Sequence, residues 1–300
     1  MGQILDHIRS RVLGRAKVGS AKRRSEGLLE GAHLSMSHGR SQEYDDLRQY
    51  VQGDDIRDVD WKASARSGGL LVKRYIAQRQ HRVQLVADVG REMLGRTPSG
   101  ELKKDVVLNV LGVVGLNSAE QGDEIGLTYG DSRGANLVTR RRGENHLEML
   151  LKTVLDHRAE HGGSSNLVTQ LRQVRHHNRQ RLVVFVVSDE PDMGEELLAE
   201  LKLLASKHKV FWTIVQDEPL LPALAGQEGA VDVATGELLL PWSAIPRSVF
   251  AEFEREEQRR RADFEAKMQT VPVAWARISG TADIVRELTA MIRRSNHHGA

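Results

Sequence analysis

Two acidic residues that each follow a run of mainly apolar residues are the first sign of a site in this sequence. Asp88 ends the run 83–87, and Asp189 follows Ser188 at the end of the continuous apolar run 182–187. A run that is apolar at every position is typical of a strand with both faces covered by helices. Ligands of such sheets bind beyond the carboxyl ends of the strands. We therefore expect both carboxylates to lie at one edge of a sheet and to mark the functional site.

Strands and helices alternate along the chain from residue 82. We predict strands at 83–88, 123–130, 181–189, 210–215 and 273–278, and helices at 102–117, 145–161, 166–177, 195–207, 246–268 and 281–293. Alternation with short connections predicts an α/β fold with a doubly wound, mostly parallel sheet. A hairpin partner at 136–140 and a second hairpin, 231–233 with 238–240, are the predicted antiparallel exceptions.

Three segments are predicted from the changes in composition. Residues 1–30 form a short amphipathic helix and a basic arm, because 9–24 contain Lys and Arg but no acid. This arm either packs on the domain or docks on an acidic partner or membrane surface. Residues 31–80 form a small β-rich subdomain that ends in a strand at 70–76. Residues 81–295 form the α/β domain, in which about 217–270 is an insertion with a C-terminal hairpin and helix extension.

The composition excludes several classes of protein. Cysteine is absent, which excludes disulfides, thiolate metal sites and a cysteine nucleophile. The net charge of +2 is too small to indicate nucleic-acid binding by the whole chain. No apolar stretch approaches the roughly 20 residues of a membrane-spanning helix, and the first residues lack the order of a signal peptide. We expect a cytoplasmic protein with no nucleic-acid partner and no transmembrane segment.

A charged motif precedes the alternating region. It reads EYDDLRQY at 43–50 and GDDIRDVDWKASAR at 53–66, and LLVKR follows at 70–74. This motif resembles the hallmark of the domain of unknown function 58 family, which places it before a von Willebrand factor A-like domain. The resemblance covers roughly residues 30–290 and implies the fold of that domain for the region after the motif.

Acids and bases alternate within this hallmark. Because arginine pairs bidentately with carboxylates, we expect a compact ion-pair network that locks the small subdomain onto the edge of the sheet. Gly53 suits a tight turn, and Trp61 is a large side chain expected to pack as an anchor. A metal or catalytic cluster is disfavoured because the bases neutralise the acids, and partner recognition is the remaining alternative. The hallmark residues are Arg48, Gly53, Asp54, Asp55, Arg57, Asp60, Trp61, Ser64 and Arg66.

The resemblance also implies a metal-ion-dependent adhesion site. Such a site uses Asp-x-Ser-x-Ser after the first strand, a threonine from a later loop and an aspartate after the fourth strand, and these oxygen ligands suit Mg²⁺. Asp88 and Asp189 match the pattern, whereas Gly90 and Glu92 replace the two serines. Ser164 or Ser165 stands in the place of the threonine. A metal would therefore rely on Asp88, Ser164 and Asp189.

We expect this site to be degenerate and to hold no cofactor, with Mg²⁺ as the alternative. Arg91 or backbone N–H groups would then neutralise the carboxylates in place of a metal. The edge is predicted to bind a partner through Asp88, Gly90, Arg91, Glu92, Ser164, Ser165 and Asp189.

These residues predict a non-enzymatic protein-interaction module. The family resemblance implies an adaptor or co-chaperone-like partner of a MoxR-type AAA+ ATPase. The alternatives are a Mg²⁺-dependent adhesion-type protein and a metal-dependent hydrolase that uses Asp88, Glu92 and Asp189. The sequence contains neither a phosphate-binding P-loop nor a Gly-x-Ser-x-Gly nucleophile motif.

Overall fold

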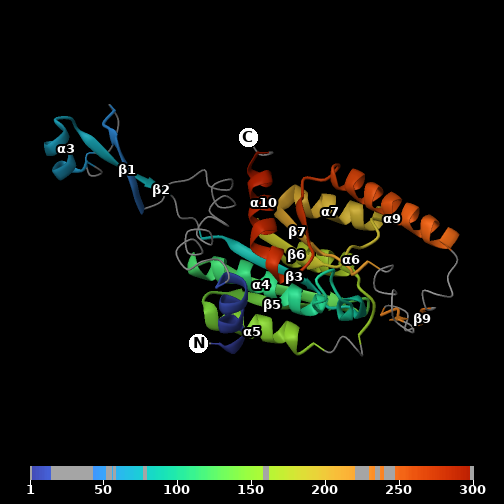
Figure 1. The fold of residues 1–300 in the computed structure, drawn as a ribbon. Helices are drawn as coiled ribbons and strands as arrows, with labels where there is room; N and C mark the ends of the chain where they lie inside the picture. The colour runs from blue at the N-terminus through green and yellow to red at the C-terminus, as the bar shows by residue number, and fades with distance from the viewer. Residues whose placement is uncertain are drawn as a thin grey trace.

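A six-stranded sheet forms the centre of the computed structural model (Figure 1). The structure describes residues 2–14, 43–51, 56, 59–76, 80–157, 162–219, 230–233, 237–239 and 247–297. The strand order is β10-β7-β6-β3-β4-β5, and every neighbouring pair is parallel except β4 with β5. The strands are β3 (Arg82–Asp88), β4 (Glu124–Asp131), β5 (Gly134–Arg141), β6 (Val183–Ser188), β7 (Lys209–Val215) and β10 (Ala274–Ile278).

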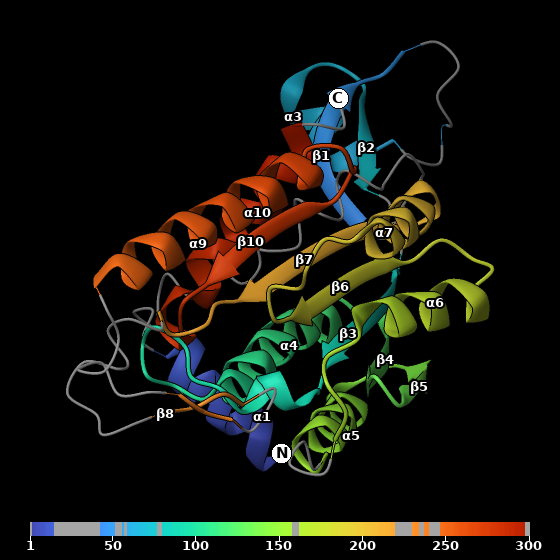
Figure 2. The ribbon, with the colours of Figure 1, turned by 90° about the vertical axis from the view of Figure 1, so that its right-hand side faces the viewer.

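Helices cover both faces of this sheet. Figure 2 shows β6, β7 and β10 side by side with their arrowheads at the same edge. One face is covered by α1 (Gln3–Ile8), α4 (Lys103–Glu120), α5 (Glu144–Leu155) and α10 (Ile284–His297). The other face is covered by α6 (Leu167–His177), α7 (Glu195–Lys207) and α9 (Arg247–Met268). The predicted doubly wound, mostly parallel α/β fold is confirmed. None of the described helices combines the length and apolar character needed to cross a bilayer.

The described residues of the hallmark segment form a small unit of two strands and one helix. In it β1 (Glu43–Gln49) pairs antiparallel with β2 (Leu71–Ile76), and α3 (Trp61–Ser67) lies between them in the chain. Asp60 caps α3 because its carboxylate accepts the N–H groups of Lys62 and Ala63 at 3.1 and 3.0 Å. Residues 53–55, 57 and 58 lie outside the described part, so the ion-pair network stays a prediction.

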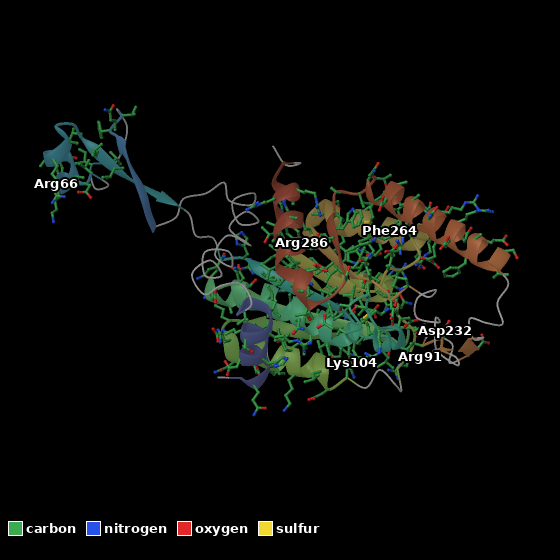
Figure 3. The ribbon with its side chains drawn as sticks, viewed as in Figure 1. Arg66, Arg91, Lys104, Asp232, Phe264 and Arg286 are labelled. Carbon is green, nitrogen blue, oxygen red and sulfur yellow. The ribbon has the colours of Figure 1, made fainter. Side chains whose placement is uncertain are left out.

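Two side chains of α3 point away from a packed interior. Trp61 is 63% exposed, so the prediction that it packs as an anchor is wrong. The described part of this unit has one helix and a two-stranded sheet, and it offers no second layer to cover the ring. Figure 3 shows Arg66 on the same helix, far from the six-stranded sheet.

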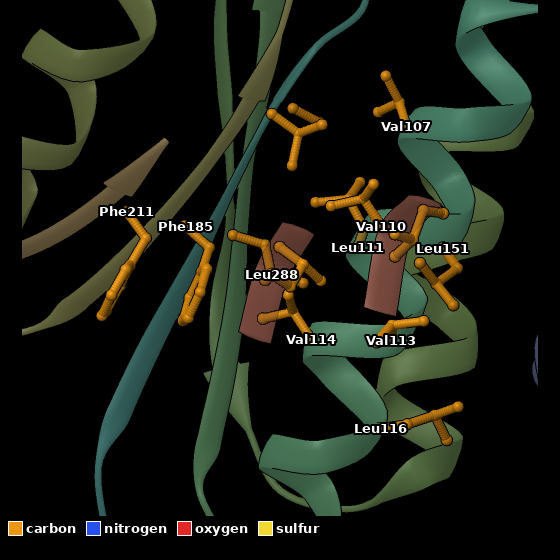
Figure 4. Close-up of a cluster of buried hydrophobic side chains, with 14 of the residues drawn as sticks. Val107, Val110, Leu111, Val113, Val114, Leu116, Leu151, Phe185, Phe211 and Leu288 are labelled. Atoms are coloured by element: carbon orange, nitrogen blue, oxygen red, sulfur yellow. The ribbon is translucent and has the colours of Figure 1, made fainter. Parts of the chain in front are cut away.

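The core between the sheet and α4 holds the first turn of that helix in place. Figure 4 shows Val110 and Val114 of α4 facing Phe185 and Phe211, whose rings stack with centroids 4.7 Å apart. Close packing with the next helix is allowed by Gly115, where an added Cβ would lie 2.3 Å from a methyl of Leu147. Because α4 is buried along most of its length, its first turn is held in one position beside the ends of β3 and β6.

The remaining elements follow the predictions, with differences at helix ends. The helix predicted at 281–293 begins with a 3₁₀ turn (Thr281–Asp283) and continues as α10 to His297. The strand at 136–140 is β5, and the second hairpin is present as β8 (Ala230–Val231) and β9 (Leu238–Leu239). The helix predicted at 145–161 ends at Leu155, and the helix predicted at 102–117 continues to Glu120.

The basic segment at the start of the chain is described as far as residue 14. There α1 is followed by a π-helical turn (Arg9–Leu13), and Ile8 is fully buried against α4. Arg9 pairs with Glu144 at 2.5 Å, and Arg11 pairs with Glu101 at 2.9 Å. This described portion packs on the domain, while residues 15–42 lie outside the described part.

Candidate functional site

The carboxyl ends of β3 and β6 meet at one edge of the sheet. The two strands are parallel neighbours, with Ala87 opposite Val187. Asp88 is the last residue of β3, and Asp189 directly follows β6. The structure therefore places the two predicted acids at the same edge.

Asp88 is buried and held by its own loop. Its side chain is 2% exposed, and Oδ1 accepts the N–H of Gly90 at 3.0 Å. Burial raises the pKa of Asp88 to about 6, the Ser165 side chain and the Gly90 N–H oppose this rise, and the charge of Glu92 adds to it. A buried carboxyl with a pKa this high carries its charge at a cost to the folded state.

Gly90 and Glu92 join the loop after β3 to the loop at 162–166. A Cβ on Gly90 would lie 2.4 Å from the backbone nitrogen of Ser165, so the close approach of the two loops requires glycine. Glu92 Oε2 accepts the N–H of Ser165 at 2.7 Å. The N–H of Arg91 donates to the carbonyl of Gly163 at 3.0 Å. Gly90 and Glu92 therefore lock these loops together.

A lysine that sequence analysis missed provides the positive charge of the site. Lys103, at the start of α4, is 1% exposed, and its Nζ lies 3.0 Å from Oδ2 of Asp189 and also contacts Asp217. Burial lowers the pKa of Lys103, but Asp189 and Asp217 raise it by more, so the net direction is upward. Burial raises the pKa of Asp189, Lys103 opposes that rise and Asp217 adds to it. One ammonium thus serves two carboxylates.

The position of Lys103 carried a signal in the sequence. It precedes Val106, Val107 and Val110 by three, four and seven positions, which places it on the apolar stripe of its helix. The neighbouring Lys104 is exposed. Two adjacent lysines suggest a solvent-facing turn unless the apolar stripe of the helix is also considered.

Arg91 does not take the neutralising role that was expected of it. Its Nε is buried and has no hydrogen-bond partner in the described parts of the chain. The ion pairs of Asp189 and Asp217 are made with Lys103.

Asp131, at the end of β4, is a second residue that sequence analysis missed. Its carboxylate binds the Arg133 guanidinium at 2.6 Å and accepts the N–H of Gly163 at 2.9 Å. Burial raises the pKa of Asp131, but the bonds from Arg133 and Gly163 outweigh this effect and lower it to about 2. The N–H of Ser132 also donates to the carbonyl of Ser164 at 2.8 Å. The strand-end rule that selected Asp88 would also have found Asp131, one position beyond the predicted strand.

A small apolar pocket adjoins Asp88 between α4 and α5. Its volume is about 30 Å³, and Leu155, which is 50% exposed, forms part of its outer wall. The remaining lining residues are Asp88, Val89, Met93, Lys104, Val107, Leu108, Val154 and His157.

The donor set does not fit the Mg²⁺ site that the resemblance implies. Within the described ranges, no three His, Asp or Glu side chains are grouped so that they could hold a metal ion. Asp189 faces the ammonium of Lys103, and Glu92 is bonded to the loop backbone. A hard cation that prefers six oxygen ligands would have to displace the ammonium of Lys103 to reach Asp189.

Comparison with known proteins identifies the family. Residues 46–267 match the sequence model of a family described as "Protein of unknown function DUF58". Two curated relatives, "Uncharacterized protein Rv1480" of Mycobacterium tuberculosis and "Uncharacterized protein Mb1516" of Mycobacterium bovis, are each 26% identical over 200 residues. The match covers 66% of this chain and 62% of each relative, so it spans less than two thirds of their length.

Solved structures give more distant matches. An aerotolerance-related membrane protein from Bacteroides fragilis has 10% identity and a TM-score of 0.45, over 71% of this chain and 99% of that one. A von Willebrand factor type A protein from Catenulispora acidiphila has 12% identity and a TM-score of 0.42, over 75% and 44% of the two chains. Because the family match spans residues 46–267, most of the sequence, the chain belongs to the DUF58 family.

Proposed function

We propose that this chain is a non-enzymatic protein-interaction module that binds a polypeptide partner through the edge around Asp88 and Asp189, without a metal ion. The size of the pocket at this edge is the observation that carries the proposal. Its volume of about 30 Å³ is roughly a tenth of the smallest pockets that usually hold small molecules. A substrate would find little enclosed space beside Asp88, whereas a partner protein needs a surface.

The groups around this pocket suit such a surface. Leu155 offers apolar area at the outer wall, and the exposed Lys104 provides a charged border. Interfaces between proteins commonly combine an apolar centre with a polar rim. The charges of Asp131 and Asp189 are balanced within the chain by Arg133 and Lys103, so a partner need not supply a cation.

The family resemblance supports a MoxR-type AAA+ ATPase as the partner. In this proposal the chain acts as an adaptor or co-chaperone-like protein for that ATPase. The absence of cysteine supports the cytoplasm, a reducing compartment, as the place of action.

Two exposed leucines give a matched test of the surface. Leu155 lies at the pocket, and Leu203, 52% exposed on α7, lies on the opposite face of the sheet. With a MoxR-type AAA+ ATPase as the probe, Leu155→Lys should weaken binding at least tenfold in interferometry, and Leu203→Lys should leave it unchanged. Equal effects of the two variants, or no binding by the wild type with or without nucleotide, would contradict the proposal.

A second experiment tests the absence of a metal and of catalysis. Calorimetric titration with Mg²⁺ or Mn²⁺ should give no binding to the wild-type chain or to Asp88→Ala. Metal-dependent hydrolysis of a phosphoester that is lost in Asp189→Ala would favour the hydrolase alternative and overturn the proposal.

A further inference from the structure

A second cavity lies at the other edge of the sheet, where β6, β7 and β10 begin. Its volume is about 450 Å³, within the range of pockets that hold small molecules. Arg181 precedes β6, Lys209 begins β7 and Ala274 begins β10, and all three residues line the cavity. Figure 2 shows the starts of these strands close to the C-terminal ends of α9 and α10. The cavity is therefore separate from the edge at Asp88.

The charged side chains of the cavity all have the same sign. Arg181, Lys209 and Arg294 line it, and the described lining residues include no aspartate or glutamate. Burial lowers the pKa of Lys209, and the charge of Arg181 lowers it further. Cations brought together in this way favour an anion between them.

A buried histidine with a neutral hydrogen-bond donor is among the lining residues. His208 is 3% exposed, and its Nδ1 accepts the N–H of Leu182 at 3.1 Å, which assigns the ring proton to Nε2. Nε2 has no hydrogen-bond partner among the described residues. Burial lowers the pKa of His208 to about 4, and the charges of Lys207, Arg181 and Arg140 act in the same direction. The ring is therefore neutral at physiological pH, and a buried donor without a partner carries an energetic penalty that an acceptor would relieve.

The rest of the wall is apolar. Met268 at the end of α9, Val271 and Val273 in the following turn, and Trp275 in β10 line the cavity. A small hydrophilic anion would leave this surface without a contact, whereas an anion on an apolar group would cover it.

We propose that this cavity binds a carboxylate borne on a medium-sized apolar group. The guanidinium groups of Arg181 and Arg294 attract and orient the carboxylate, and His208 supplies an N–H donor for it. The apolar residues contact the hydrocarbon part. A free organic acid and the C-terminal residue of a polypeptide both present this chemistry.

Calorimetry at low ionic strength distinguishes these two sources. The probes are octanoate, a pentapeptide with a C-terminal leucine, and the C-terminal amide of that peptide. Tighter binding of octanoate assigns the site to a free organic acid, and tighter binding of the peptide assigns it to a polypeptide terminus. The amide should bind at least tenfold more weakly than the free peptide. If neither acid binds at millimolar concentration, or if the amide binds as well as the better acid, the proposal is wrong.

Exposed arginines provide matched variants. Arg181→Gln and Arg294→Gln should each weaken binding of the better acid at least fivefold, because each removes a charge from the wall. Arg286→Gln changes an exposed arginine of the same helix, α10, outside this cavity, and should have no effect. Nitrogen-15 NMR should show the Nε2 resonance of His208 shifting on saturation. Equal effects of the three variants, or an unchanged His208 resonance, would overturn the proposal.

Discussion

Nζ of Lys103 lies 3.0 Å from Oδ2 of Asp189 at the edge of the sheet that we propose as the partner-binding site. The lysine belongs to the first turn of a helix that is buried along most of its length, so its ammonium has little freedom to move away. A buried charge is tolerated when it is paired and hydrogen-bonded, and Lys103 meets this condition through Asp189 and Asp217. In the proposed function, this ammonium provides the positive charge that a metal ion would otherwise supply.

Replacement of Lys103 by methionine should destabilise the fold by about 3–5 kcal/mol, because it leaves the carboxylate of Asp189 buried without its cation. Urea denaturation followed by circular dichroism measures the change. Asp217→Asn is the control: Asp217 is 55% exposed, so losing its charge should cost less than about 1 kcal/mol. Adding Asp189→Asn to Lys103→Met should recover part of the loss. Similar losses in Lys103→Met and Asp217→Asn would contradict the view that the buried pair holds this edge together.

Substitution of Gly90 by alanine should destabilise the protein by about 1–3 kcal/mol, as overpacking does in other interiors. The added Cβ would lie 2.4 Å from the backbone nitrogen of Ser165, and backbone atoms cannot move aside as a flexible side chain can. Gly69→Ala is the matched control, because a Cβ there meets nothing within 4 Å. Chemical denaturation of both variants gives the comparison. If Gly90→Ala is as stable as Gly69→Ala, the close approach of the two loops is not required.

The strands and helices of the main domain were largely predictable from the sequence. Strands β3 and β6 are covered on both faces, so their apolar runs stand out and their terminal acids could be placed at one edge. The helix predicted at 145–161 was harder to bound. It ends at Leu155, and His157 beyond it lies 3.9 Å from Asp131, a tertiary contact that local sequence does not reveal.

Much of the site could not be predicted, because its contacts also join distant parts of the chain. Asp189 was identified from its strand, but its ion pair with Lys103 joins two distant parts of the chain. The bond from the Ser165 N–H to Glu92 likewise depends on the meeting of two loops. The sequence shows glycine at position 90 and glutamate at position 92, whereas the use of these residues to join the loops became visible in the structure.

Removal of the Glu92 side chain should weaken that junction. Glu92→Ala leaves the N–H of Ser165 without its acceptor and should destabilise the fold by about 1–3 kcal/mol. Glu92→Gln keeps an acceptor oxygen and should cost less than half as much. Hydrogen exchange followed by mass spectrometry should show faster exchange at 162–166 in Glu92→Ala than in Glu92→Gln. Equal exchange rates in the two variants would show that this hydrogen bond does not hold the loop.

The difference in stability between Asp88→Asn and the wild type should depend on pH. The pKa of Asp88 rises from about 3.8 in the unfolded chain to about 6 in the folded one, so between these values the folded state binds a proton that the unfolded state releases. Raising the pH through this window therefore lowers the stability of the wild type, by about 3 kcal/mol in total. Asparagine carries no charge and keeps an acceptor for the Gly90 N–H.

The variant should match the wild type below pH 4 and exceed its stability by up to about 3 kcal/mol above pH 7. Urea denaturation of both proteins at each pH from 4 to 8 measures the difference, in which other titrating groups such as His208 cancel because both chains contain them. Glu92 and Lys103, the charges that act on Asp88, are unchanged in the variant. A difference that is constant across this range would show that folding does not raise the pKa of Asp88.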